Sequence, residues 1–256
     1  MSTFKFAVLF LVLLTVGDCE GRVCKVVDDE ATMAVCLNCE FLRKNFYSCF
    51  GYKHALFRFG AHMSAVEKLQ MRGGKGESLE FDRGEECPNL LDFSIGNAVD
   101  LTIVDLLNLP LGIEKLSFYD NEIKRLKNFR YIEKLTNLTK LDMSFNKLRG
   151  FSVKFLPKSV KVLALCGNLV TQINMKVLLD QMFSVNKFEK LDLRENPIDC
   201  HCEKFEANLE TFDRTITSCD YVECFVCDWL KSRIFKFNEL SNDLAFISEN
   251  RHCVTT

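Results

Sequence analysis

The chain repeats one short apolar pattern, and an asparagine closes each clear copy. In each copy apolar residues occupy the first, fourth and sixth of nine positions, and asparagine occupies the ninth. Clear copies cover 113–121, 138–146, 160–168 and 188–196. Two weaker copies, 66–74 and 90–98, keep the apolar positions but lack the asparagine. The copies begin 22 to 28 residues apart, and a regular spacing in this range indicates a repeated structural unit that stacks on its neighbours.

The pattern within a copy predicts a short strand. The fourth and sixth positions are apolar and the residues between them are mostly polar, so the alternation has a period of two. Unrelated amphipathic helices would instead show a 3.6-residue period through each segment. Stacked copies would bury positions one, four and six as a continuous apolar column. One longer stretch, 175–183, has apolar residues at helical spacing and predicts a helix.

The asparagine at position nine falls where the chain leaves the strand and turns. Its side-chain amide can satisfy backbone groups that would otherwise be buried without a hydrogen-bond partner. Apolar residues such as Ile123 and Leu148 follow the asparagines and are expected to line the return path of each unit. The asparagines are Asn121, Asn146, Asn168 and Asn196.

The first residues have the form of a secretory signal peptide. One lysine precedes an apolar run over 6–16, and small or polar residues follow at 17–21. Such a run is too short to span a bilayer. Cleavage after Gly17 and cleavage after Cys19 both remain open. We expect a secreted, extracellular protein with no membrane span.

Cysteine usage agrees with an oxidising compartment. The chain has 256 residues and 13 cysteines, and after a signal peptide these indicate disulfides. Six lie before residue 88, six lie after residue 199, and Cys166 stands alone between the two groups. Zinc is the alternative for the C-x-x-C pairs at 36–39 and 224–227. A second half-site is missing at the usual separation, however, so we expect no metal and no cofactor.

The repeats, together with Asn196-Pro197-x-x-Cys200-x-Cys202, resemble extracellular leucine-rich repeat proteins with cysteine-rich caps. Small secreted arthropod members and Toll-type receptor ectodomains are the most similar in style, over roughly residues 66–253. The resemblance implies an α/β fold: a curved solenoid with short parallel strands on its concave face and disulfide-rich caps at both ends. The domains are then a signal peptide over 1–17, an N-terminal cap over 18–65, about six repeats over 66–196, and a C-terminal cap over 197–256.

The resemblance also implies disulfides in the C-terminal cap. In such proteins the C-x-C pair bonds two later cysteines, so Cys200 and Cys202 are expected to pair with Cys224 or Cys227 and with Cys253. The chain departs from the family because its aromatic-leucine pair, Trp229-Leu230, lies beyond Cys227, and because the cap has two cysteines more than the usual four.

The residues between the buried strand positions form the candidate binding surface. They would face the concave side, and one column of them, at position three, is mainly lysine. We therefore expect an extracellular protein, acidic in character, or a glycan as the partner; a merely solubilising face is the alternative. The candidate partner-binding residues are Lys115, Ser117, Tyr119, Lys140, Asp142, Ser144, Lys190, Asp192 and Arg194.

Two further residues suggest modifications. By repeat register Cys166 is exposed on the concave face, so it is a candidate for an intermolecular disulfide; a free thiol without a role is the alternative. Asn137, in Asn137-Leu138-Thr139, is the N-glycosylation acceptor and falls on the rim.

Secreted protein–protein recognition is the function these features favour, and the resemblance places it in innate immunity or other extracellular signalling. A matrix scaffold that assembles through Cys166 is the competing class. We expect no enzyme, because no known catalytic motif occurs. We expect no nucleic-acid binding, because the net charge is −2. The expected oligomeric state is a monomer or a disulfide-linked dimer.

Overall fold

The computed structural model describes residues 38–43, 46–50, 56–59, 63–186, 188–200, 227, 230–231 and 235–236. The expected signal peptide lies outside the described residues, and so do large parts of both cysteine-rich segments. In the described part, no helix has the length and apolar character that crossing a bilayer requires.

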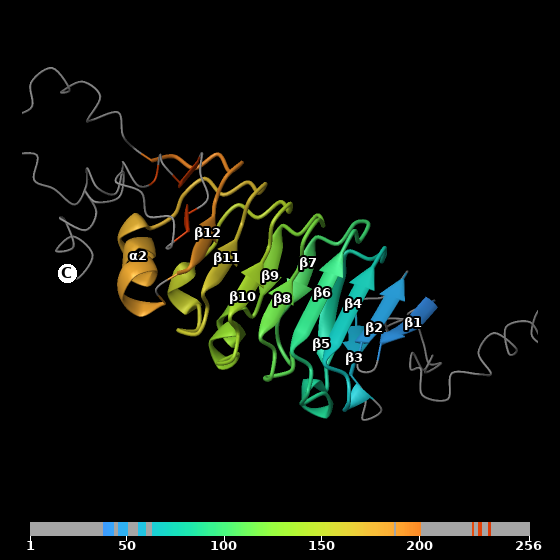
Figure 1. The fold of residues 1–256 in the computed structure, drawn as a ribbon. Coiled ribbons are helices and arrows are strands. Elements are labelled where there is room, and N and C mark those ends of the chain that lie inside the picture. Colours follow the sequence, from blue (N-terminus) through green and yellow to red (C-terminus); the bar gives the residue numbers. More distant parts are fainter. Residues whose placement is uncertain are drawn as a thin grey trace, which may run out of the picture.

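The chain is an α/β protein with two sheets whose strands are mainly parallel (Figure 1). Along the sequence it passes back and forth between the sheets. The larger sheet contains, in order, β1 (Asn38–Arg43), β2 (Phe46–Phe50), β4 (Lys68–Arg72), β6 (Asp92–Gly96), β8 (Lys115–Ser117), β10 (Lys140–Asp142), β11 (Val162–Ala164), β12 (Lys190–Asp192) and β13 (Phe235–Lys236). The smaller sheet contains β3 (Leu56–Arg58), β5 (Ser78–Asp82), β7 (Ile103–Asp105) and β9 (Arg125–Lys127).

The strands predicted from the apolar pattern are confirmed, including those of the two weaker copies. From β2 to β12 the pairing is parallel and in register, so equivalent positions of successive copies stand side by side. The residues at position four form one aligned row, and each is at most 1% exposed. This row is Leu69, Phe93, Leu116, Leu141, Leu163 and Leu191.

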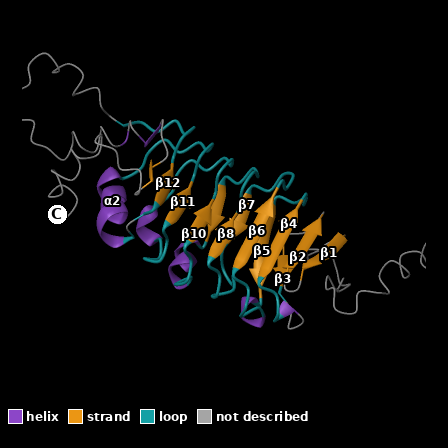
Figure 2. Cartoon of the chain, in the orientation of Figure 1, coloured by secondary structure: helices purple, strands orange, loops and turns teal. Residues whose placement is uncertain are grey.

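The smaller sheet was not predicted. Its strands lie in the return segments, where we expected only apolar anchors, and they are three to five residues long. Beyond β9 these segments form short helical turns along the same side of the molecule (Figure 2). Two of them are η3 (Phe129–Lys134) and η4 (Val153–Phe155).

The predicted helix over 175–183 is confirmed as α2 (Met175–Asp180), which continues as a π-helical turn, η5 (Gln181–Val185). Asn174 caps α2, because its side-chain oxygen accepts a hydrogen bond from the Val177 N–H at 3.0 Å. Leu178 and Leu179 bury the inward side of the helix in the apolar core.

The asparagines form a hydrogen-bonded column between the copies, as their position predicted. Nδ2 of Asn146 donates to the carbonyl oxygens of Met143 at 3.0 Å and Ser144 at 3.2 Å within its own copy. It also donates at 2.7 Å to the carbonyl oxygen of Phe118 in the preceding copy. Its Oδ1 accepts from the Ile123 N–H at 3.0 Å. One amide therefore closes the turn of its own copy and fixes it to the copy before.

The same arrangement recurs at the three other asparagines. Each Nδ2 reaches a carbonyl of the preceding strand, at 3.1 Å for Asn121, 2.9 Å for Asn168 and 2.8 Å for Asn196. Each Oδ1 accepts a backbone N–H from the last residue of the preceding copy or from the second residue after it. All four asparagines are at most 9% exposed. Water cannot reach the backbone groups around them, so the asparagine amides supply the hydrogen bonds that these groups need.

Replacing Asn146 with Ala should destabilise the protein strongly. The substitution leaves the buried Ile123 N–H without its acceptor, at about 1–3 kcal/mol. The three carbonyls that Asn146 bonds each lose one donor but keep another. We therefore expect a loss of about 2–4 kcal/mol in the free energy of unfolding. Urea denaturation measures this loss. Asn137→Ala, at an exposed asparagine, is the control, with an expected change within about 0.5 kcal/mol. Equal effects of the two substitutions would contradict the role assigned to Asn146.

Candidate functional site

The outward surface of the larger sheet is built from positions three, five and seven of each copy, and we call it the open face. Because side chains alternate along a strand, these positions point away from the core that positions four and six fill. The predicted concave-face residues lie here in three rows across neighbouring strands. Lys115, Lys140 and Lys190 share the first row, at position three.

Lys115 and Lys140 are the cationic centre of the open face. They are exposed, and they lie directly opposite each other in the β8–β10 pairing. Like charges opposite each other on a sheet repel. On the neighbouring strand β6, Asp92 stands opposite Lys115 in the pairing, but its carboxylate meets Lys68 of β4 at 3.0 Å. Neither Lys115 nor Lys140 has an acidic partner within 4 Å among the described residues. The face therefore carries uncompensated positive charge over β8 and β10.

The other two acidic residues of the open face, Asp142 and Asp192, are engaged within their own chain segments. Asp142 accepts a hydrogen bond from the Ser144 N–H at 3.1 Å. Asp192 accepts from the Arg194 N–H at 3.2 Å, and its two oxygens receive Nε and Nη2 of that arginine at 2.9 Å each. Such a two-bond pair satisfies both charges locally. The expectation that Asp192 and Ser144 are exposed was wrong: they are 6% and 5% exposed.

Cys166 is also buried, which corrects the expectation of an exposed thiol. It is a free cysteine and only 5% exposed. The small side chains at position seven, Cys166 and Ser144, stay near the level of the backbone where larger neighbours cover them. Tyr119, at the same position, is long enough to emerge and is 46% exposed. Position in the repeat sets the direction of a side chain, whereas its length decides whether it reaches solvent.

Burial raises the pKa of the Cys166 thiol, and the nearby carboxylates of Asp192 and Glu195 raise it further. A thiol is nucleophilic as its thiolate, so this environment keeps Cys166 unreactive at neutral pH. The intermolecular disulfide stays a prediction, but it requires the local structure to open first.

Position eight contains an unexpected aromatic residue. In all six copies this residue adopts a left-handed backbone conformation, with φ between 55° and 66°. Glycine, asparagine and aspartate adopt this conformation most readily, and four of the six residues are of these types. The residues are Gly73, Asn97, Asp120, Phe145, Gly167 and Glu195. A bulky residue such as Phe145 is a true outlier here, at a cost of about 1 kcal/mol or more.

The ring of Phe145 lies at the surface beside Tyr119. The two ring centroids are 5.4 Å apart in an edge-to-face arrangement, and Phe145 is 41% exposed. On its other side the ring occupies the space above Gly167, where a Cβ would lie 2.7 Å from a ring carbon. Sequence analysis singled out Tyr119 but missed Phe145. Aligning the copies by their asparagines would have revealed the only aromatic residue at a turn position.

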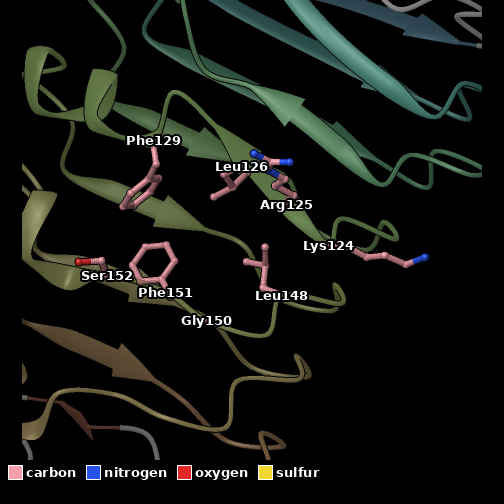
Figure 3. Close-up of a pocket in the computed structure, with 8 residues that line it drawn as sticks. All are labelled: Lys124, Arg125, Leu126, Phe129, Leu148, Gly150, Phe151 and Ser152. Atoms are coloured by element: carbon pink, nitrogen blue, oxygen red, sulfur yellow. The ribbon is translucent and has the colours of Figure 1, made fainter.

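A hollow of about 230 Å³ lies on the opposite side, next to β9 (Figure 3). Its walls include Leu126, Phe129, Leu148 and Phe151, and Lys124 extends from it toward solvent. β9 is the last strand of the smaller sheet, so the hollow marks the place where strand pairing stops. Pockets for small molecules usually measure about 300–1,000 Å³, so this one is small for a ligand.

The remaining sequence predictions concern cysteines and glycosylation. Cys200 and Cys227 form a disulfide with a Cα–Cα distance of 5.7 Å, one of the pairings that the resemblance left open. Cys202, Cys224 and Cys253 lie outside the described residues. Asn137 is exposed in the turn before β10. Among the described residues, no three His, Cys, Asp or Glu side chains are grouped so that they could hold a metal ion.

No model of a known protein family matches the chain.

Native Cys166 should react slowly with iodoacetamide at pH 8. Because the thiol is only 5% exposed, the rate should be at least about tenfold below that of the unfolded chain. Its raised pKa acts in the same direction, since it lowers the fraction of thiolate. Peptide-resolved mass spectrometry measures the rate. Reaction at the speed of an unhindered thiol would contradict the buried position. Non-reducing electrophoresis of wild type and Cys166→Ser then tests for a dimer that depends on this cysteine.

Secretion from a eukaryotic host should attach a glycan at Asn137, because the acceptor is exposed. The expected result is a mass decrease on treatment with a peptide N-glycosidase that Asn137→Gln abolishes. Thr139→Ala, which removes the motif and keeps the asparagine, should give the same result. A shift that survives both substitutions would exclude this site.

Proposed function

We propose that the chain is a secreted leucine-rich repeat protein that recognises an extracellular protein through its open face. Three observations support the proposal: the in-register parallel strands, the asparagine column and the spacing of the copies. On this proposal the copies form a curved solenoid, the open face is its concave side, and cysteine-rich segments cap its ends. Extracellular signalling, including innate immunity, is the setting that the resemblance implies.

The observation that carries the binding role is the pair Lys115 and Lys140. Lys68 and Arg194 are neutralised by Asp92 and Asp192. Lys115 and Lys140 instead are two exposed cations side by side on neighbouring strands, with no ion pair among the described residues. Solubility alone does not require two like charges directly opposite each other, an arrangement that costs the free protein some stability. An acidic partner supplies the missing negative charge, and complementary charge chiefly increases the association rate and the specificity.

The competing function, a scaffold assembled through Cys166, is less favoured because that thiol is 5% exposed. A thiol–disulfide exchange needs an accessible thiolate, and the surroundings of Cys166 provide neither access nor a low pKa.

Reversing both charges in Lys115→Glu/Lys140→Glu should weaken capture of the partner from the native extracellular fluid. We expect a loss of at least about tenfold, equivalent to about 1.4 kcal/mol, because both attractive contacts become repulsive. Quantitative mass spectrometry of proteins captured on the immobilised variants measures the effect. Raising the salt concentration should elute the partner from wild type, since exposed charges are screened.

The matched control is Lys154→Glu/Lys158→Glu. Both lysines are exposed and lie in or just after η4, in the segment between β10 and β11 and away from the open face. The net charge change is the same, so this variant should keep the partner. Equal recovery on all three proteins would reject the open face as the binding surface.

A further inference from the structure

Phe145 and Glu195 both depart from the residue types that favour a left-handed turn, and Phe145 is the one that places an aromatic ring at the surface. At the equivalent turn positions the chain uses residues that tolerate a positive φ, or a flexible charged side chain at Glu195. Phe145 adopts the same conformation with φ of 55°, yet its ring is 41% exposed. An aromatic residue that serves packing would be expected in the core rather than at a strained turn. Strain at a surface residue points toward function.

The surroundings hold the ring outward rather than letting it fold away. Gly167 has no Cβ, and this leaves the space that one side of the ring occupies. Tyr119, in the neighbouring copy, meets this ring edge-to-face, with the two ring centroids 5.4 Å apart. The result is a two-ring cluster at the ends of β8 and β10, the strands that begin with Lys115 and Lys140. Exposed aromatic clusters of this kind are common centres of binding energy.

We propose that Phe145 and Tyr119 form the apolar anchor of the open face, and that the partner offers an acidic extended segment carrying one large apolar side chain. This inference rests on the proposed function, since it uses the same surface. Charge complementarity selects the acidic character, because the two lysines lack acidic partners among the described residues. The aromatic pair selects the apolar side chain, which would cover the rings on binding.

The spacing on the face sets the spacing in the partner. Lys115 precedes Tyr119 by four residues, and Lys140 precedes Phe145 by five. At about 3.3 Å per residue, Lys115 and Tyr119 are at most roughly 13 Å apart, since β8 already ends at Ser117. An extended segment spans that distance when its apolar side chain lies about four residues from its acidic pair.

Fluorescence anisotropy with three short synthetic peptides tests the inference. The complete peptide carries a Glu-Glu pair and, about four residues away, one tryptophan; it is made in both sequence orders. The second peptide replaces tryptophan with alanine, and the third replaces each glutamate with glutamine. Wild type should bind the complete peptide about tenfold more tightly than either of the others. No preference for the complete peptide would overturn the proposed partner class.

Phe145→Asn is the decisive variant, because asparagine suits a left-handed turn. Phe145→Asn should bind the complete peptide about tenfold more weakly than wild type does, as weakly as it binds the peptide without tryptophan. It should bind the peptide without tryptophan as tightly as wild type does. The urea midpoint should stay or rise. Glu195→Asn is the matched control: it makes the same change at the same position two copies later, so its midpoint should also stay or rise while peptide binding is kept.

The remaining outcomes separate the anchor from the function. Unchanged affinity in Phe145→Asn, or a clearly lower urea midpoint, would overturn the anchor and make the ring a packing residue. If Lys115→Glu/Lys140→Glu still weakens binding of the peptide without tryptophan, the proposed function survives that failure. If neither variant changes binding, both proposals fail. Sedimentation that shows wild type as a dimer and Phe145→Asn as a monomer would replace the acidic partner with a second copy of the chain.

Discussion

The asparagine amide between successive copies is the interaction on which the rest of the structure depends. Each copy is too short to satisfy its own turn, and the carbonyls that end each strand point into a region that water cannot reach. One buried amide donates to those carbonyls and accepts an N–H from the preceding copy. Because the same bonds recur at Asn121, Asn168 and Asn196, they fix the register of the strands. That register determines which side chains share the open face.

The left-handed turn at position eight orients the asparagines of this column. In four copies a left-handed residue directly before the asparagine turns the chain so that the amide faces inward. The two weaker copies, which end in Gly74 and Ala98, keep the same left-handed turn. The requirement is conformational, so it restricts the residue type more than it restricts polarity. Glu195 and Phe145 show that the chain accepts some strain here. At Phe145 the strain coincides with an exposed ring, and that combination separates this residue from the others in the column.

The sequence predicted the parts of the fold that depend on period and on buried polar chemistry. Leu116, Leu141 and Leu163 occupy adjacent strands as the apolar pattern required, and the asparagines bond as their position implied. The smaller sheet was missed because strands such as β9, at three residues, are too short to show an alternation. Cys166 was assigned to the surface because the pattern gives direction only. How deeply a side chain is buried also depends on its length and on its neighbours. For Cys166 these neighbours include the Arg194–Asp192 pair, which comes close to it only after folding.

On the open face some charged groups are paired within the chain, whereas Lys115 and Lys140 are free to bind a partner. Asp192 and Arg194 satisfy each other, Asp142 binds its own backbone, and Lys68 meets Asp92 across the strand pairing. These groups gain little from a partner, since each would have to break a bond to make another. Lys115 and Lys140 repel each other in the free protein, so an acidic group placed between them relieves an existing cost as well as adding attraction. Together with the two exposed rings, they make β8 and β10 the part of the face where binding gains the most.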